Sequence, residues 1–218
     1  MTQKNKGFFL SFEGGEGAGK TTQIALLRDW LSKQGKTVVT TREPGGTPEA
    51  EKIRDLLVQK DAIWSAKAEA FLLFAGRDMH YRTLIAPALE SGHIVITDRF
   101  TDSTRAYQGH ALDLGIDVVD KLADLTLDGL EPDLTILLDL PAEDGLQRSQ
   151  KRTRSTGQGD QKFEQYDLAF HEKLRQGYLK LSENSPARFE VIDANRSVQD
   201  VHDLICKAVK KTEILKTV

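Results

Sequence analysis

This 218-residue sequence is poor in cysteine and in long apolar runs. Its one cysteine, Cys206, excludes an internal disulfide and a multi-cysteine metal site, and it stands in a helix-like apolar pattern typical of a small buried side chain. The apolar run at residues 8–12 ends at Glu13, and no stretch approaches the roughly 18 apolar residues of a membrane span. We therefore expect a protein of the cytoplasm that has no membrane partner.

An excess of either charge is missing as well. The chain has 30 Lys and Arg residues against 33 Asp and Glu residues, which gives a formal net charge of −3. No overall positive field draws the molecule to nucleic acid, so we expect no nucleic-acid partner and only local anion sites. The length suits one substantial core, and we predict a single domain over residues 1–218.

Short apolar runs alternate with longer stretches of helical period, which is the pattern of βαβ units around a parallel sheet. The predicted strands are residues 8–12, 37–41, 93–97, 134–140 and 189–192. The predicted helices are residues 20–34, 48–58, 66–90, 102–108, 117–128, 142–154, 166–182 and 198–210. Thr47 is the expected cap of the second helix. The expected fold is a three-layer α/β domain.

A phosphate-binding motif follows the first predicted strand. The run Gly14-Gly15-Glu16-Gly17-Ala18-Gly19-Lys20-Thr21 matches the P-loop pattern G-x-x-x-x-G-K-[ST] between a strand and a helix. Its glycines let backbone N–H groups converge on phosphate oxygens, and the helix N-terminus adds positive potential. We expect Lys20 to bridge the β and γ oxygens of ATP and the Thr21 hydroxyl to hold Mg²⁺. The alternative is a glycine-rich turn that binds nothing.

A P-loop alone does not distinguish kinases from GTPases, transport ATPases or motors. A GTPase is expected to carry an Asn/Thr-Lys-x-Asp string, and the sequence has none. Asp98 and Arg99 follow the strand predicted at residues 93–97, at the edge where open α/β sheets bind ligands. Asp98 suits a metal site near the P-loop, or alternatively a cap of the next helix. Arg99 can bind two oxygens of an acceptor phosphate.

Residues suited to a second substrate stand on two predicted helices. Phe74 and Arg77 are three positions apart, so a ring and a guanidinium share one side of the helix, as a nucleobase would require. Alternatively, Phe74 is a core residue and Arg77 a surface ion-pair partner. The helix predicted at residues 102–108 offers groups for a base and a sugar, unless it is an ordinary amphipathic helix: Ser103, Arg105, Tyr107 and Gln108.

Charged residues also follow the second predicted strand. The turn at residues 44–46 leaves Arg42 and Glu43 at the carboxyl end of that strand, where we expect both charges to face the P-loop. The alternative is a plain strand-to-helix connection.

Basic residues stand before and at the start of a segment rich in Gly, Gln, Ser and Thr at residues 152–161. We predict a mobile lid over about residues 148–163 that excludes water and brings positive charge to a transferring phosphoryl group. The alternative is a solvated basic helix face. The cations concerned are Arg148, Lys151, Arg152 and Arg154.

Seven segments together carry a resemblance to a known family: residues 12–21, 41–47, 98–103, 106–109, 131–133, 145–148 and 192–194. Across nearly the whole chain they are similar to the bacterial thymidylate kinases. The resemblance implies a P-loop kinase fold with a five-stranded parallel sheet and a short lid. It also implies a homodimer that uses ATP and Mg²⁺ to convert dTMP to dTDP, in the synthesis of dTTP.

The resemblance implies roles for single residues as well. Gly14 to Thr21 and Arg148 would bind ATP, with Asp193-Ala194 beside the adenine. The acceptor would be bound by Glu16, Arg42, Arg77, Arg99, Ser103, Tyr107 and Gln108, and the base would stack on Phe74 or Leu73. Thr21 and Asp98 would hold the metal, and Lys20 and Arg99 would act in catalysis with Arg152 or Arg154 of the lid.

Three rival functions remain open. The chain could be a deoxynucleoside kinase or a kinase of another nucleoside monophosphate. In a different class, it could be an ATP-dependent switch or a repair ATPase, although the absence of a basic excess argues against that class.

Overall fold

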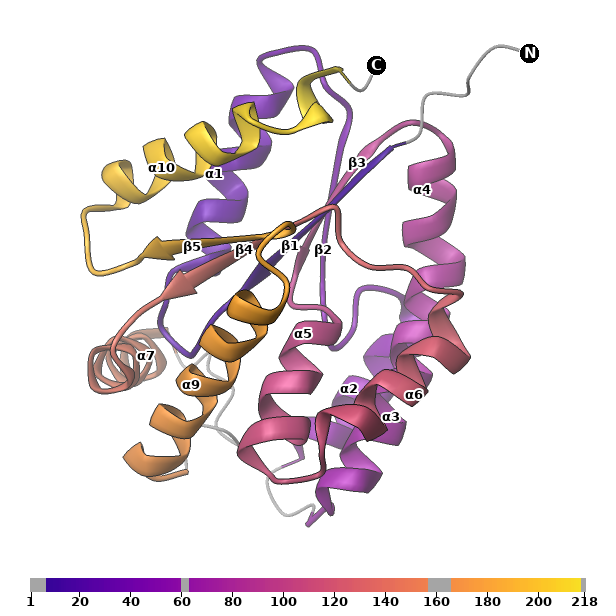
Figure 1. The fold of residues 1–218 in the computed structure, drawn as a ribbon, viewed down its shortest axis with the longest axis vertical. Coiled ribbons are helices and arrows are strands. Elements are labelled where there is room, and N and C mark those ends of the chain that lie inside the picture. The colour runs from indigo at the N-terminus through magenta and orange to yellow at the C-terminus, as the bar shows by residue number, and fades with distance from the viewer. Residues whose placement is uncertain (1–6, 60–62, 157–165, 217–218) are drawn as a thin grey trace.

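The computed structural model describes residues 7–59, 63–156 and 166–216. At its centre is a parallel sheet of five strands in the order β2-β3-β1-β4-β5 (Figure 1). Each strand begins and ends within one residue of its predicted range, so the predicted five-stranded parallel α/β fold is confirmed. The strands are β1 (Phe8–Glu13), β2 (Val38–Arg42), β3 (Ile94–Asp98), β4 (Leu134–Asp139) and β5 (Phe189–Asp193).

The central strand β1 is buried on both faces. Phe8 and Phe12 pack in a core with α1 (Lys20–Ser32) and α10 (Val198–Lys210), which lie together on one side of the sheet in Figure 1. Phe9 packs in a second core with α3 (Ala66–His80), α4 (Ala86–Glu90) and α6 (Ile116–Leu127). Because successive strand residues point to opposite faces, helices cover both sides of the sheet and make three layers.

Helix boundaries follow local signals closely. The structure gives α2 (Pro48–Val58) and α10 the predicted bounds, and the Thr47 hydroxyl caps α2 by accepting from the Ala50 N–H. The buried Cys206 of α10 also agrees with its predicted place.

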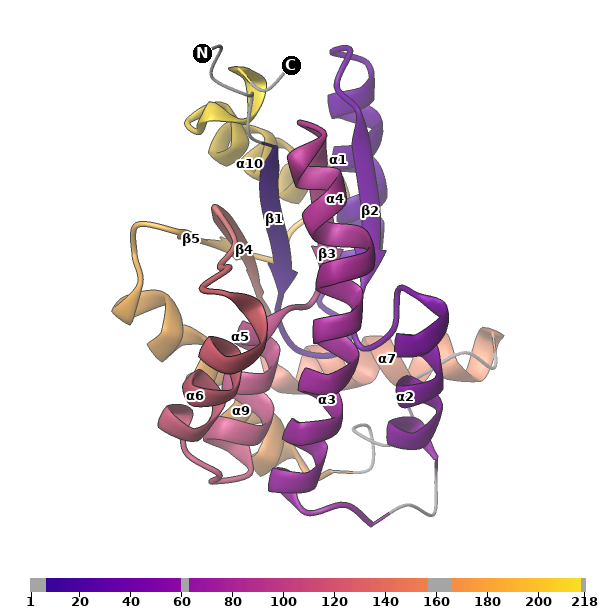
Figure 2. The same ribbon diagram turned by 90° about the vertical axis from the view of Figure 1, so that its right-hand side faces the viewer.

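The long helix predicted at residues 66–90 contains an irregularity. A π-helical segment, η1 (Tyr81–Ile85), separates α3 from α4, although all three run on as one rod in Figure 2. The Ala86 N–H donates to the Tyr81 carbonyl, five residues back. Pro87 has no N–H, and its ring would clash with the carbonyl four residues before it, so the helix widens at this point.

The remaining elements carry much of the site. Helix α5 (Thr101–Thr104) runs into a second π-helical segment, η2 (Arg105–Ala111), which packs against α9 (Leu168–Asn184). Helix α7 (Ala142–Thr156) leaves the end of β4, and a short 3₁₀ helix, η3 (Glu213–Lys216), was not predicted.

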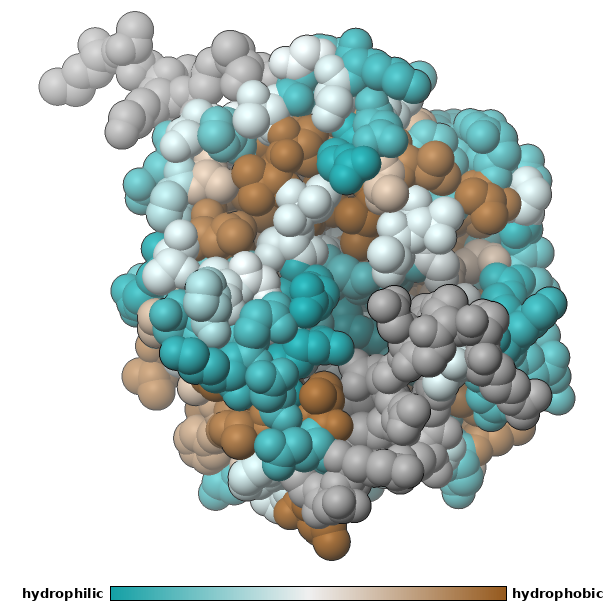
Figure 3. All heavy atoms as spheres, turned by 180° about the vertical axis from the view of Figure 1, so that it is seen from behind, coloured by the Kyte–Doolittle hydropathy of each residue, from teal (hydrophilic) through white to brown (hydrophobic). Residues whose placement is uncertain are grey.

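Hydrophilic residues cover much of the face in Figure 3, with hydrophobic residues in smaller groups between them. Within the described ranges, none of the helices combines the length and the apolar character that a membrane crossing needs.

Candidate active site

The P-loop, residues 14–21, joins β1 to α1 as the motif predicts. Gly14, Gly17 and Gly19 have φ angles of 135°, 69° and 94°, which glycine adopts without a steric penalty. The Lys20 ammonium donates to the carbonyls of Gly14 and Gly15 at 3.0 and 3.1 Å. Burial, and the positive charge of nearby Arg99, lower the pKa of Lys20. The lysine is thus held inside the loop, within reach of phosphate oxygens that enter it.

The start of α7 packs directly on the P-loop. A Cβ atom on Gly17 would collide with the carbonyl oxygen of Gly145, and one on Gly145 would lie 2.5 Å from the carbonyl oxygen of Glu16. Further along α7, Arg148 donates to the Ala194 carbonyl at 3.2 Å and to the Asn195 side chain at 3.1 Å. The two segments that the family resemblance places beside the adenine of ATP therefore lie together.

Asp98 ends β3 and accepts a hydrogen bond from the Thr21 hydroxyl at 3.3 Å. It does not cap the next helix, because Phe100 holds the cap position of α5 and no side chain caps it. A hydroxyl and a carboxylate beside a triphosphate site are ligands that suit Mg²⁺. In the described part of the chain, no group of three or more His, Cys, Asp or Glu residues could hold a metal ion by itself. A metal at this point would therefore share phosphate and water ligands.

Arg99 follows β3 in the left-handed backbone conformation, with a φ angle of 71°. Such a conformation costs about 1 kcal/mol or more for a residue other than glycine and persists only where the surroundings enforce it. Here the Arg99 N–H donates to the Phe12 carbonyl at 2.9 Å, and its carbonyl accepts from the Thr97 hydroxyl at 2.8 Å. The two central strands thereby fix where this arginine side chain starts.

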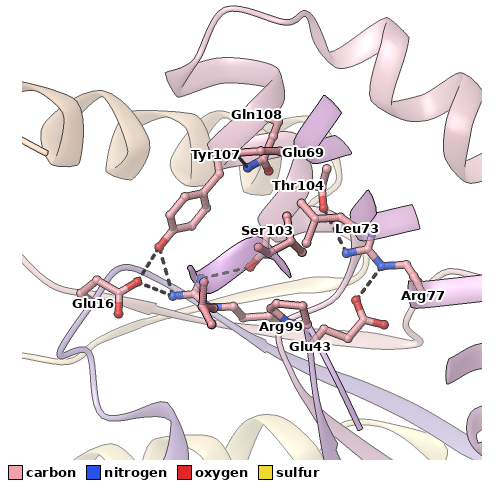
Figure 4. Close-up of a pocket in the computed structure, with 13 residues that line it drawn as sticks. Glu16, Glu43, Glu69, Leu73, Arg77, Arg99, Ser103, Thr104, Tyr107 and Gln108 are labelled. Atoms are coloured by element: carbon pink, nitrogen blue, oxygen red, sulfur yellow. Dashed lines mark hydrogen bonds and ion pairs between the residues drawn. The ribbon is translucent and has the colours of Figure 1, made fainter. Parts of the chain in front are cut away.

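Both terminal nitrogens of the Arg99 guanidinium have partners (Figure 4). Nη2 donates to the Glu16 carboxylate at 2.9 Å and to the Tyr107 hydroxyl at 3.0 Å, whereas Nη1 donates to the hydroxyls of Ser103 and Tyr178 at 3.1 and 3.0 Å. The Tyr107 hydroxyl also donates to Glu16 at 2.8 Å. Four of the predicted acceptor residues thus form one charge-balanced cluster with Tyr178, which the sequence did not single out.

Glu13, buried at the end of β1, supports this cluster from behind. It accepts hydrogen bonds from the Phe100 N–H at 2.8 Å and from the Ser103 hydroxyl at 2.6 Å. Burial, and secondly the nearby carboxylate of Asp102, raise the pKa of Glu13 to about 7. Sequence reasoning treated Glu13 only as the end of an apolar run. A charged residue closing a strand with no solvent-exposed face was the signal that could have identified it.

Arg77 of α3 lies at the other end of the same region in Figure 4. This buried guanidinium donates to Glu43 at 2.6 Å and to the Thr104 hydroxyl at 3.0 Å. Glu43 was expected to face the P-loop, and that expectation is wrong: the carboxylate is bound by Arg77 and, at 3.0 Å, by the His80 ring. Burial opposes the charge of Glu43, but Arg77 and His80 outweigh it and lower its pKa. A buried carboxylate needs such partners because burial removes it from water.

Two other predicted charges do not line the acceptor pocket. The Arg42 side chain is 52% exposed, pairs with Glu51 at 3.0 Å and does not line the pocket described below. Arg105 points away from the site, where it binds three acidic side chains: Asp102, Asp120 and Glu131.

A pocket with about 590 Å³ of empty space lies between Arg99 and Arg77, both of which line it. Part of this space is open to solvent, so a ligand can enter the pocket from outside. Leu73 and Gln108 also line it. Phe74 does not: its ring is 1% exposed and belongs to the core. The structure therefore brings Leu73, the other candidate for base stacking, to the pocket wall.

Two buried polar atoms of the pocket residues have no hydrogen-bond partner among the described residues. They are Nη1 of Arg77, a donor, and Oε1 of Gln108, an acceptor. The other end of the Gln108 amide is bound, because its Nε2 donates to Glu69 at 2.8 Å. Buried polar groups are nearly always paired in folded proteins. Because Arg77 and Gln108 both line the pocket, a ligand with complementary groups would satisfy these two atoms.

Part of the predicted lid lies outside the described residues. This applies to residues 157–165 and to the side chains of Arg152 and Arg154. The lid and the choice between these two arginines stay predictions.

Comparison with known proteins gives a consistent result. The family model described as thymidylate kinase matches residues 12–205. The chain belongs to the thymidylate kinase family. Its relatives in this family include the thymidylate kinase of Sulfurihydrogenibium sp., 42% identical over 96% of this chain and 100% of that protein. The thymidylate kinase of Caulobacter vibrioides is 49% identical over 96% of this chain and 97% of that protein.

A solved structure of the thymidylate kinase family has the same fold. The crystal structure of thymidylate kinase from Ehrlichia chaffeensis aligns with a TM-score of 0.75 at 32% sequence identity, covering 94% of this chain and 99% of that one. The resemblance inferred from the sequence motifs and the P-loop kinase fold are both confirmed.

Proposed function

We propose that this chain transfers the γ-phosphoryl group of ATP to dTMP, giving dTDP and ADP. The observation that supports this most is a pocket beside the P-loop with the partly buried Arg99 at one end and the buried Arg77 at the other. A triphosphate site and a monophosphate site thus adjoin at the carboxyl edge of the sheet, where open α/β folds bind their ligands.

On the donor side, the P-loop amides and Lys20 bind the phosphates of ATP, and Arg148 lies against the adenine. When bound, Mg²⁺ would neutralise phosphate charge, held by the hydroxyl of Thr21 and the carboxylate of Asp98. Phosphoryl transfer requires positioning and charge neutralisation more than covalent help from the protein, and these residues are of the kinds that provide both.

Arg99 binds the acceptor phosphate. Its guanidinium already lies against Glu16 and the hydroxyls of Ser103 and Tyr107, and a phosphate would enter by exchanging with these partners. Arg42 stands on the neighbouring strand in register with Asp98, so its exposed side chain can add a second positive charge.

The base lies at the Arg77 end. Thymine presents an N3–H donor next to the O4 acceptor, and the two unpaired atoms, Oε1 of Gln108 and Nη1 of Arg77, complement that pair. Leu73, rather than the buried Phe74, provides the apolar contact for the ring. Tyr107 and Glu16 lie by the sugar, where a ribose 2′-hydroxyl would be crowded.

Further parts of the proposal rest on membership of the family. The chain forms one domain over residues 1–218, with a lid at about 148–163 whose Arg152 or Arg154 adds charge at the transferring phosphoryl group. It acts as a homodimer in the cytoplasm and serves the synthesis of dTTP.

The test is an assay of purified protein with ATP and Mg²⁺ against dTMP, dUMP, AMP, CMP and thymidine in turn. We expect dTMP to be consumed far faster than AMP, CMP or thymidine, and activity to stop when EDTA removes the metal. Comparable turnover of thymidine would identify a deoxynucleoside kinase instead. ATP turnover that responds to a macromolecule and ignores mononucleotides would overturn the proposal.

A further inference from the structure

Gln108 and Arg77, which carry the two unpaired atoms, each donate another hydrogen bond to a buried carboxylate. Glu69, 2% exposed, accepts from Nε2 of Gln108 at 2.8 Å, and Glu43 accepts from Nε of Arg77 at 2.6 Å. Glu69 stands in the first turn of α3, and Gln108 stands 39 positions later on η2. The partial positive charge at the start of a helix favours an anionic side chain at the place of Glu69.

Glu43 and Glu69 have different effects, because Glu43 binds a guanidinium and Glu69 binds an amide. A guanidinium only donates, so Arg77 presents a donor to the pocket whatever lies behind it. An amide has a donor end and an acceptor end and can turn over. An ionised carboxylate accepts only, so Glu69 binds the amino end of Gln108 and turns the carbonyl oxygen away from itself.

We propose that Glu69 is a specificity-determining positioning residue, which selects a pyrimidine that carries an N–H at position 3 by fixing the orientation of the Gln108 amide. The inference rests on the proposed function. Thymine and uracil carry N3–H beside a carbonyl, which matches the acceptor and donor that Gln108 and Arg77 present. Cytosine carries a bare N3 beside an amino group, so it would bring an acceptor against Oε1 and a donor against Nη1.

The size of the effect follows from the cost of unmade hydrogen bonds in a buried site. A site built to hydrogen-bond one edge rejects a ligand that leaves its buried groups unpaired, often by much more than a size mismatch would. Fixing one amide accounts for one of the two contacts. We therefore expect Glu69 to contribute a factor of about 10 to the preference for dTMP over dCMP.

The experiment uses Glu69→Gln, which keeps the shape and removes the one-directional acceptor. With a second amide behind it, Gln108 can present either end to the pocket. We expect kcat/KM for dTMP to fall about 10-fold, kcat/KM for dCMP to hold or rise, and the ratio of the two to fall about 10-fold or more. A merely structural role would lower both values together, so an unchanged ratio overturns the inference.

Two further variants sharpen the test. Glu43→Gln is the matched control, since Arg77 donates in either case: it should lower both kcat/KM values and leave their ratio within about 3-fold. The swapped pair Glu69→Gln with Gln108→Glu again leaves an acceptor facing the pocket, so the ratio should recover toward that of the wild type. If the swapped pair keeps the ratio of Glu69→Gln, the orientation argument is wrong.

Circular dichroism shows whether Glu69→Gln folds. If it does not, the ratio measured for the swapped pair is the test. Turnover of dTMP by the wild type distinguishes failure of the proposed function from failure of the role proposed for Glu69. A wild type that ignores dTMP defeats the proposed function. A wild type that uses dTMP, with an unchanged ratio in Glu69→Gln, defeats only the role of Glu69.

Discussion

The two ends of the acceptor pocket are prepared for a ligand in opposite ways. At the Arg99 end both terminal nitrogens are occupied, by Glu16 and three hydroxyls. At the Arg77 end one donor and one acceptor have no partner among the described residues. A base can therefore bind unpaired atoms of Arg77 and Gln108, whereas a phosphate has to displace the hydrogen-bond partners of Arg99. In the pocket the positive charge of Arg99 is balanced by Glu16. The guanidinium becomes available to a phosphate only when that phosphate replaces Glu16 as its partner.

The largest effect is expected from Arg99→Ala. This change removes the charge that receives the acceptor phosphate, and we expect kcat with dTMP to fall about 10³-fold. The Kd for ATP, measured by calorimetry, should change little, because the P-loop is intact. Arg28→Ala, on an exposed part of α1, is the matched control and should leave kcat unchanged. Full turnover in Arg99→Ala would mean that the phosphate binds elsewhere.

The Arg77 end of the pocket is tested by the substitution Arg77→Leu. Its loss leaves the Glu43 carboxylate buried without the guanidinium that balances it. We expect the free energy of unfolding in urea to fall by about 3 kcal/mol or more. The double variant Arg77→Leu with Glu43→Gln removes both charges and should lose less than the single variant. An equal loss in both would show that the Glu43 charge is not what destabilises the single variant.

Glu13→Gln tests the support of the Arg99 end through pH. The folded chain keeps a proton on Glu13 up to pH about 7, whereas the ordinary pKa is 4.5. Between these values the folded state binds more protons, so the contribution of Glu13 to stability falls as pH rises. Glutamine does not ionise. The unfolding free energy of the variant relative to wild type should therefore rise by about 3 kcal/mol from pH 4.5 to pH 7.

A difference that stays constant over this pH range would contradict the raised pKa of Glu13. The measurement is urea unfolding of both proteins at several pH values, with buffer and salt held fixed.

The smallest effect is expected from Tyr107→Phe. The ring stays, and Glu16 and Arg99 each lose one hydrogen bond out of several. We expect kcat/KM for dTMP to fall about 10-fold, which corresponds to about 1.4 kcal/mol. A loss as large as that of Arg99→Ala would mean that the cluster acts as a unit and that its parts cannot be ranked.

The sheet and the P-loop were predictable because their signals are local. An apolar strand, a glycine-rich turn and a following helix are read within about 25 residues, and the structure agrees with each strand to one residue. The widened turn at η1 was harder to predict from the sequence, because periodicity alone does not reveal how a helix accommodates Pro87.

The acceptor pocket was predictable only in part. Arg77, Arg99 and Gln108 could be named from charge and position, but their partners come from distant segments. Glu43, Glu69 and Tyr178 meet them across 34, 39 and 79 positions of the chain. Phe74 and Leu73 could not be separated by spacing, since residues three and four positions from Arg77 both lie near it on a helix.

The contact between Gly17 and Gly145 has a consequence for how charge can be delivered. Any side chain at position 17 would act as a wedge and lift α7 off the turn that it touches. The loop therefore cannot host a cationic group of its own there while this helix stays docked. Extra positive charge for the migrating phosphoryl group therefore has to come from a position other than 17.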